Sequence, residues 1–156
     1  MTDAADTAQV VVRPPIAWAL AALVGFALNW LIPLPFMPPA VSVGWLGGAL
    51  FAMALALLVW AATTLTRAGS HVPTSMPTMT IVDSGPYRFT RNPIYLAMFL
   101  ALIGLAMSFD SLWLLAALVP FALVIRYGVV AREEAYLERK FGDLYRRYRT
   151  RVRRWL

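Results

Sequence analysis

The amino-acid sequence predicts an all-α integral membrane protein with about four transmembrane helices, the last two a hairpin, followed by a C-terminal amphipathic helix. Hydrophobic residues make up 60% of the 156 positions, and the mean hydropathy of +0.65 is too high for a soluble domain. Because a chain in lipid must satisfy its own backbone hydrogen bonds, these apolar segments are expected to be helical. The length fits a single membrane domain, residues 1–156, with a tail and two spans in residues 1–66 and a core in residues 67–156.

The first two apolar segments, residues 16–32 and 43–65, are suited to crossing a membrane. Residues 1–15 form a short tail that lacks the basic start and cleavage site of a signal peptide. The connection, residues 33–42, contains four prolines and no charge, so we expect a rigid non-helical loop. The second segment also carries small residues suited to close helix–helix contact: Gly44, Gly47 and Gly48.

The next two apolar segments form the predicted hairpin. Residues 94–109 number only sixteen, or ~24 Å at 1.5 Å per residue, which is less than a ~30 Å hydrocarbon core. The segment from Leu112 reaches Arg126 after fourteen apolar residues, so a full span has to continue to about Ala131. Arg126 therefore either extends to the membrane interface or lines a polar cavity.

Residues 132–156 have an amphipathic pattern, with apolar residues at steps near three and four and arginines between them. The apolar positions are Leu137, Phe141, Leu144, Tyr145, Tyr148, Val152 and Trp155. We expect a helix, broken near Gly142, that lies along the membrane surface or folds back over the loop of residues 67–93. Glu133 and Glu134 come at its start, where the helix dipole favours carboxylates if a break in the helix precedes them.

Basic residues gather at the C-terminal end, where nine of the fourteen lie at or after Arg132, and the formal net charge is +6. Such a tail suits the anionic cytoplasmic leaflet better than nucleic acid, so we expect membrane lipids and no nucleic acid as partners. By the positive-inside rule, both termini and the 67–93 loop face the cytoplasm, whereas the uncharged 33–42 loop does not. The expected location is therefore a bacterial inner (cytoplasmic) membrane.

The most specific stretch is the polar, cationic segment of residues 84–95, which stands between apolar helices. Pro86 follows a glycine in a turn signal, and Pro93 restrains Asn92 to extended geometry while suiting the first turn of the next helix. The chain has no cysteine, and His71 is its single histidine, so neither a disulfide nor a metal cluster is expected. The segment should hold polar groups rigidly at the mouth of a membrane helix.

An ordered set of motifs runs from this loop to the tail. The motifs are Ala68-Gly69-Ser70-His71-Val72-Pro73, Gly85-Pro86-Tyr87-Arg88, Thr90-Arg91-Asn92-Pro93-x-Tyr95, Glu133-Glu134 and Phe141-Gly142-x-x-Tyr145-x-x-Tyr148. Over roughly residues 66–155, the set resembles the isoprenylcysteine carboxyl methyltransferase and phospholipid methyltransferase group of membrane enzymes. Asn92 stands where many members of that group have histidine, which weakens a proton-carrying role there but keeps a hydrogen-bonding one.

The resemblance implies methyl transfer from S-adenosylmethionine to a lipophilic or amphiphilic acceptor with a carboxylate, amine or hydroxyl head group. It implies a cofactor site made by His71, Tyr87, Arg91, Asn92, Pro93, Tyr95, Glu133 and Glu134. Of these, the residues expected to be catalytic are Arg91, Asn92 and Glu134.

The chemistry of this cofactor can be matched to residue types independently. Its cationic and hydroxyl groups require a carboxylate, its own carboxylate requires a cation, and its sulfonium favours aromatic walls. The candidate carboxylates are Glu133 and Glu134, and the candidate cations are Arg91 with Arg88 or Arg126. The candidate walls are Tyr87, Phe89 and Tyr95.

Adjacent helical residues point about 100° apart, so only one glutamate of the pair can face the hairpin squarely. Glu134 shares a stripe with Leu137 and Phe141, so we predict Glu134 as the deeper cofactor contact and Glu133 as a supporting one. Two other classes stay open: a non-catalytic scaffold or inactive family member, and a small transporter. The sequence chooses neither the methyl acceptor, the kind of atom methylated, nor the oligomeric state.

Overall fold

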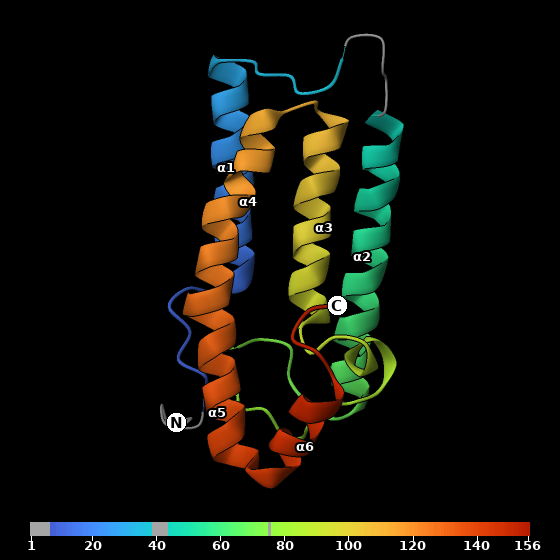
Figure 1. Cartoon of the computed structure of the whole chain (residues 1–156), viewed down its shortest axis with the longest axis vertical. Coiled ribbons are helices and arrows are strands. Elements are labelled where there is room, and N and C mark those ends of the chain that lie inside the picture. The colour runs from blue at the N-terminus through green and yellow to red at the C-terminus, as the bar shows by residue number, and fades with distance from the viewer. Residues whose placement is uncertain (1–6, 39–43, 75) are drawn as a thin grey trace.

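The computed structural model describes residues 7–38, 44–74 and 76–156, and all the regular structure in these ranges is helical. Four helices stand side by side as a bundle: α1 (Pro14–Leu31), α2 (Gly44–Arg67), α3 (Pro93–Ser108) and α4 (Leu112–Leu123). At the lower end of Figure 1 lie the 68–92 loop with its short η2 helix (Gly85–Arg88), α6 (Asp143–Arg151) and both ends of the described chain. The predicted all-α architecture is confirmed.

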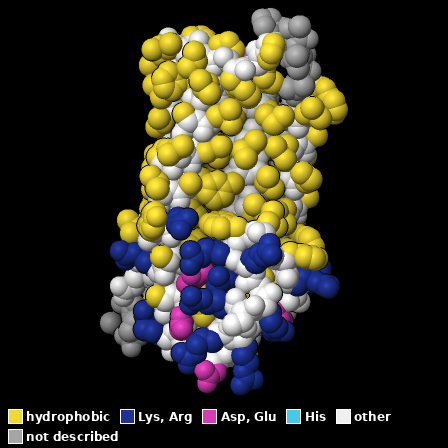
Figure 2. All heavy atoms as spheres, in the orientation of Figure 1, with side chains coloured by type: hydrophobic (Ala, Val, Ile, Leu, Met, Phe, Trp, Pro, Cys, Tyr) yellow, Lys and Arg dark blue, Asp and Glu magenta, His cyan; other side chains and the backbone are white. Residues whose placement is uncertain are grey.

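Three helical segments are long and apolar enough to cross a membrane: α1, α2 and the continuous stretch Leu112–Phe141. The helix α3 is apolar but has only 16 residues, as the sequence predicts for the first arm of the hairpin. Figure 2 shows an apolar surface over most of the bundle, with Lys, Arg, Asp and Glu gathered at the lower end. These features agree with a membrane protein.

The helical stretch that begins with α4 runs without a break past the glutamate pair. It continues through η3 (Val124–Val130), a stretch with π-type hydrogen bonds, into α5 (Ala131–Phe141). Because no break precedes them, Glu133 and Glu134 do not lie at a free helix start, so the condition for stabilisation by a helix dipole is not met. Arg126 is exposed, and its guanidinium lies 5.5 Å from the ring centre of Tyr127. The structure therefore places Arg126 on the outer surface of the bundle and not in a polar cavity.

Close contact between α2 and α3 depends on glycines. A Cβ atom added to Gly47 would lie 2.6 Å from the Gly104 carbonyl oxygen, and one added to Gly104 would lie 2.9 Å from that of Gly47. Along α2, the buried residues recur every seventh position at Gly47, Ala54 and Ala61. The predicted small-residue face is thus confirmed at Gly47, whereas a Cβ atom added to Gly48 would meet no atom within 4 Å, so Gly48 lies outside that face.

The amphipathic tail breaks at Gly142, as expected, and folds back under the loop. Gly142 has φ 51° and separates α5 from α6. The buried residues Tyr145, Tyr148 and Val152 pack together with Ile81 of the loop. Leu144 is 57% exposed, so its predicted place on the inward apolar stripe is wrong.

Candidate active site

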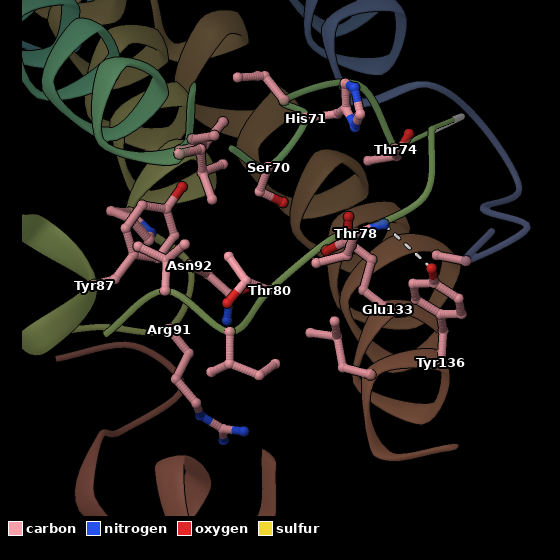
Figure 3. A pocket seen from close by; sticks show the side chains of 18 of the residues that line it. Ser70, His71, Thr74, Thr78, Thr80, Tyr87, Arg91, Asn92, Glu133 and Tyr136 are labelled. Carbon is pink, nitrogen blue, oxygen red and sulfur yellow. Dashed lines mark hydrogen bonds between the residues drawn. The ribbon is translucent and has the colours of Figure 1, made fainter. Parts of the chain in front are cut away.

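A small polar cavity of about 140 Å³ lies where the 68–92 loop meets the start of α3, α5 and α6. Seven of the eight predicted cofactor residues line it: His71, Tyr87, Arg91, Asn92, Pro93, Tyr95 and Glu133. In Figure 3, Tyr87, Arg91 and Asn92 lie on one side of the cavity, and Glu133 and Tyr136 lie on the other. Segments far apart in the sequence therefore supply its walls.

The turn at η2 places some side chains of the loop in the interior and others on the surface. Gly85 has φ 55°, and a Cβ atom there would lie 2.8 Å from the Thr64 hydroxyl oxygen, so the loop can approach α2 only with glycine. Tyr87 is buried as a result, while Arg88 and Phe89 point outward, with Phe89 59% exposed. Arg88 and Arg126, expected as alternative cofactor cations, and Phe89, expected as a wall, therefore do not line the cavity.

The C-terminal residues hold the Arg91 loop in place through backbone groups. The carbonyl oxygen of Arg154 accepts hydrogen bonds from the Thr90 hydroxyl at 3.1 Å and from Asn92 Nδ2 at 2.9 Å. The amide of Arg91 donates to the Arg153 carbonyl at 2.9 Å. Asn92 thus lines the cavity and also joins the loop to the tail.

A tyrosine of α6 adds a further link to the loop. Tyr148 Oη donates to the Tyr87 carbonyl at 2.8 Å. Burial raises the pKa of Tyr148, which keeps its hydroxyl protonated and able to donate. The loop is therefore fixed from both α6 and the residues that follow it.

Glu133 has a single hydrogen-bond partner among the described residues. Tyr95 Oη, from the first turn of α3, donates to Glu133 Oε1 at 2.6 Å. No Lys, Arg or His within the described ranges forms an ion pair with Glu133. A carboxylate with no ion-pair partner in the described ranges thus faces the polar cavity beside Tyr95.

Glu134 has different surroundings. It lies 3.1 Å from Arg91 Nη1 and 2.6 Å from Arg154 Nη2, and it does not line the cavity. Arg91 Nη1 also donates to Tyr145 Oη at 3.0 Å, and the hydrogen bond to Glu134 raises the pKa of Arg154. The sequence predicts Glu134 as the deeper of the two, whereas here Glu133 lines the cavity and Glu134 does not, because the side of α5 that carries Glu134 faces the returning tail.

Two buried side-chain polar atoms lack a hydrogen-bond partner in the described part of the chain, namely Tyr87 Oη and Arg91 Nε. Both residues line the polar cavity. Burial raises the pKa of Tyr87, so its oxygen carries a proton that it can donate. An unpaired buried donor lowers the free energy of unfolding by about 1–3 kcal/mol. Two such donors in one cavity therefore indicate a place for a ligand with acceptor groups.

Sequence reasoning missed some lining residues. Tyr136 is 4% exposed and accepts hydrogen bonds from the Thr78 amide at 3.2 Å and from Lys140 Nζ at 3.1 Å. Its position three residues after Glu133 places it on the same face of α5, and this spacing could have identified it as a lining residue. Ser70 and Thr78 were missed because nothing in an irregular loop shows which side chains point inward.

A second cavity, of about 700 Å³, lies beside the first between α1, α2 and α3. Its walls are mainly apolar, and it shares Val72, Pro73, Thr74, Ile94 and Tyr95 with the polar cavity. The shared residues form a partition between a polar site and an apolar one. This cavity was not predictable from the sequence, because its walls come from helices whose mutual placement is not encoded in a local pattern.

Similarity to known proteins indicates the family of this chain. A family model described as phospholipid methyltransferase matches residues 43–144, so the match includes α2 and starts before the sequence motifs described above. An uncharacterized protein of Haemophilus influenzae (strain ATCC 51907 / DSM 11121 / KW20 / Rd) is 44% identical over 63 residues, which is 40% of this chain and all of that protein. No solved structure matches the chain.

Proposed function

The chain belongs to the phospholipid methyltransferase family, and we propose that it transfers the methyl group of S-adenosylmethionine to a lipophilic or amphiphilic acceptor at the cytoplasmic membrane face. The observation that carries the proposal is a pair of buried donors, Tyr87 Oη and Arg91 Nε, that have no partner among the described residues and share one cavity with the Glu133 carboxylate. The adjoining apolar cavity supports a lipophilic partner.

The residues present fit the chemical groups of this cofactor. Glu133, which forms no ion pair within the part of the chain that the structure describes, suits an ammonium or a ribose hydroxyl. Arg91 Nε and the Tyr87 hydroxyl suit acceptor atoms such as a carboxylate. When bound, S-adenosylmethionine would supply a methyl group on a sulfonium, and the aromatic lining residues Tyr95 and Tyr148 suit that cation.

Methyl transfer is an in-line displacement that depends mainly on positioning the two reactants and excluding water. Tyr95 lines both cavities, so the partition around it is where an acceptor head group would meet the cofactor site. For an amine or hydroxyl acceptor, a proton has to leave, and Glu133 is the cavity carboxylate able to accept it. Glu134 would act indirectly, by fixing the guanidinium of Arg91.

The variant Tyr87→Phe tests the proposal. If the hydroxyl serves a ligand, the variant should bind S-adenosylmethionine roughly ten- to a hundredfold more weakly, as for a hydrogen bond to a charged group of about 1.5–3 kcal/mol. The ligand-free protein should be as stable as the wild type or more stable, because an unpaired buried donor is removed. Calorimetry with S-adenosylmethionine and S-adenosylhomocysteine measures the first effect, and thermal unfolding measures the second.

Arg88→Gln is the matched control, since Arg88 is an exposed cation of the same loop and lies outside the cavity. It should bind the cofactor as the wild type does. Absence of binding by the wild type would favour the alternative, a non-catalytic membrane scaffold or inactive family member. Equal binding by Tyr87→Phe and the wild type would remove Tyr87 from the site.

A further inference from the structure

The structure also points to an anion-binding group beside the apolar cavity, and this inference rests on the proposed function. We propose that Arg13 binds an anionic group, phosphate or carboxylate, of an amphiphilic methyl acceptor whose hydrocarbon chain lies in the 700 Å³ cavity. The N-terminal segment, defined here as residues 8–13, holds Arg13 in that position. The segment precedes residues 43–144, so it lies outside the part of the chain that the family match covers.

The lining of the cavity specifies the occupant. Its volume lies within the ~300–1,000 Å³ common for small-molecule sites, and its walls include Trp18, Phe51, Leu55 and Met98. Among the described residues that line it, Arg13 alone carries a charge. A hydrocarbon chain suits the walls and an anion suits the single cation, so the complementary molecule is an anionic amphiphile.

The N-terminal segment is held against the bundle by several contacts. Val10 and Val12 pack against the main hydrophobic core. The amide of Val11, which lies between them, donates to the Gly128 carbonyl at 3.0 Å. Just before them, the Gln9 carbonyl accepts a hydrogen bond from Arg132 Nη1 at 3.0 Å. The position of Arg13 at the start of α1 is therefore determined by tertiary contacts rather than by the helix alone.

The same segment borders both cavities. Ala8 lines the polar cavity, and Arg13 lines the apolar one five residues later. Tyr95 also lines both. An acceptor with its chain among α1, α2 and α3 would thus have its anionic group near Arg13 and its reacting group toward Tyr95.

The side chain of Arg13 is available for such a ligand. It is exposed, and it forms no hydrogen bond or ion pair with any other residue that the structure describes. A guanidinium presents donors in a planar fork that matches phosphate and carboxylate oxygens. Arg13 can therefore bind an anion without giving up a partner within the described chain.

Binding of brominated amphiphiles tests the site directly. Brominated dodecyl phosphate, dodecanoate and dodecanol share a chain and differ in the head group, and bromine quenches tryptophan fluorescence when it enters a cavity containing Trp18. With the purified full chain in a nonionic detergent, we expect the two anionic probes to bind roughly tenfold more tightly than the alcohol, equivalent to about 1.4 kcal/mol. The stronger of the two anionic probes identifies phosphate or carboxylate as the preferred group.

Variants then assign the preference to Arg13. Arg13→Gln should bind all three probes like the alcohol, whereas Arg13→Lys should keep most of the preference. Arg67→Gln should match the wild type, because Arg67 is an exposed arginine in the last turn of α2 and lines neither cavity. Trp18→Phe should remove most of the quenching, which locates the probe in the cavity.

Three results would overturn the inference: an unchanged head-group preference in Arg13→Gln, equal weakening of all three probes in that variant, or full quenching in Trp18→Phe. Calorimetry with S-adenosylmethionine separates this inference from the proposed function. Arg13→Gln should bind the cofactor as the wild type does, since Arg13 does not line the polar cavity. If the wild type bound no cofactor, the proposed function would fail, while the probe experiments would still decide the anion site.

Discussion

Glu133 and Glu134 are sequence neighbours with opposite surroundings. Glu133 accepts a hydrogen bond from Tyr95 and lines the polar cavity. Glu134 is paired with Arg91 and Arg154, and its side chain is only 12% exposed. Removing one partner from a largely buried ion pair leaves the remaining charges uncompensated, which commonly costs about 3–5 kcal/mol. The two carboxylates should therefore respond differently to the same substitution.

The first prediction compares Glu133→Gln with Glu134→Gln. Glu133→Gln should weaken S-adenosylmethionine binding tenfold or more, about 1.4 kcal/mol, with little change in thermal stability. Glu134→Gln should mainly lower the unfolding temperature, because Arg91 and Arg154 lose their carboxylate. Calorimetry and thermal unfolding of both variants give the two quantities. Stronger loss of binding in Glu134→Gln at unchanged stability would instead support the order predicted from the sequence.

At the residue scale, the sequence identified most of the residues that line one cavity but not the contacts that each of them makes. The motif residues Arg91, Asn92 and Tyr95 do line one cavity. The order of the two glutamates was not predictable, because it depends on the tail returning to α5 and placing Arg154 beside Glu134. A helical angle alone separates neighbouring side chains but does not say what lies opposite each of them.

At the scale of single elements, Gly142 determines the direction of the tail. Its φ of 51° and ψ of −121° are rarely adopted by residues with a side chain. No atom lies within 4 Å of a Cβ added there, so the cost of a substitution comes from the backbone alone. The turn lets α6 run back to the loop, where the carbonyls of Arg153 and Arg154 hold residues 90–92.

The second prediction is that Gly142→Ala destabilises the protein by about 1–3 kcal/mol, the usual cost of such a backbone conformation. Cofactor binding should weaken as well, because the loop loses its hold on the tail. Gly48→Ala is a matched control, since it also meets no atom within 4 Å but lies within α2. The control should be neutral or slightly stabilising in thermal unfolding. Equal behaviour of the two variants would mean that the turn at Gly142 accepts a side chain.

The polar cavity leads to a third prediction, about the loop of residues 70–74 and 76–82. Its 140 Å³ is below the ~300–1,000 Å³ typical of ligand sites, so we expect this loop to move when the cofactor binds. The loop is held partly by side chains, through Tyr136 Oη and Ser70 Oγ, which makes local opening easier than in a helix. Hydrogen exchange should slow in the loop on addition of S-adenosylmethionine and stay unchanged in α3. Unchanged exchange in the loop would contradict the required motion.

The elements themselves were largely predictable, because long apolar segments in lipid have few alternatives to helix. The break at Gly142 was expected from the glycine within an amphipathic pattern. The π-type stretch Val124–Val130 was not, because no local sequence pattern distinguishes π-type from α-type hydrogen bonding there. That stretch keeps α4 and α5 continuous, which is why the glutamates lie within a helix rather than at its start.

At the scale of the whole molecule, charge separates the two ends of the bundle. Figure 2 shows the charged side chains on this face gathered at the end that carries α6, below the apolar surface. At the opposite end, the carboxylate of Asp110 accepts hydrogen bonds from the amides of Phe36 and Met37 at 3.0 and 2.9 Å. This contact fixes the 33–38 part of the first loop to the turn of the hairpin. The two ends therefore differ in charge and are each held by tertiary contacts.

The last prediction concerns orientation. Positively charged segments near membrane helices are retained on the cytoplasmic side, so the end with α6 should face the cytoplasm. The natural chain has no cysteine, so a single one can report each end: Pro35→Cys for the apolar loop and Leu144→Cys for the exposed face of α6. In spheroplasts, a membrane-impermeant maleimide should label position 35 directly and position 144 only after the membrane is opened. The reverse pattern would invert the orientation, and labelling of both positions from one side would contradict the placement of the two loops at opposite ends of the bundle.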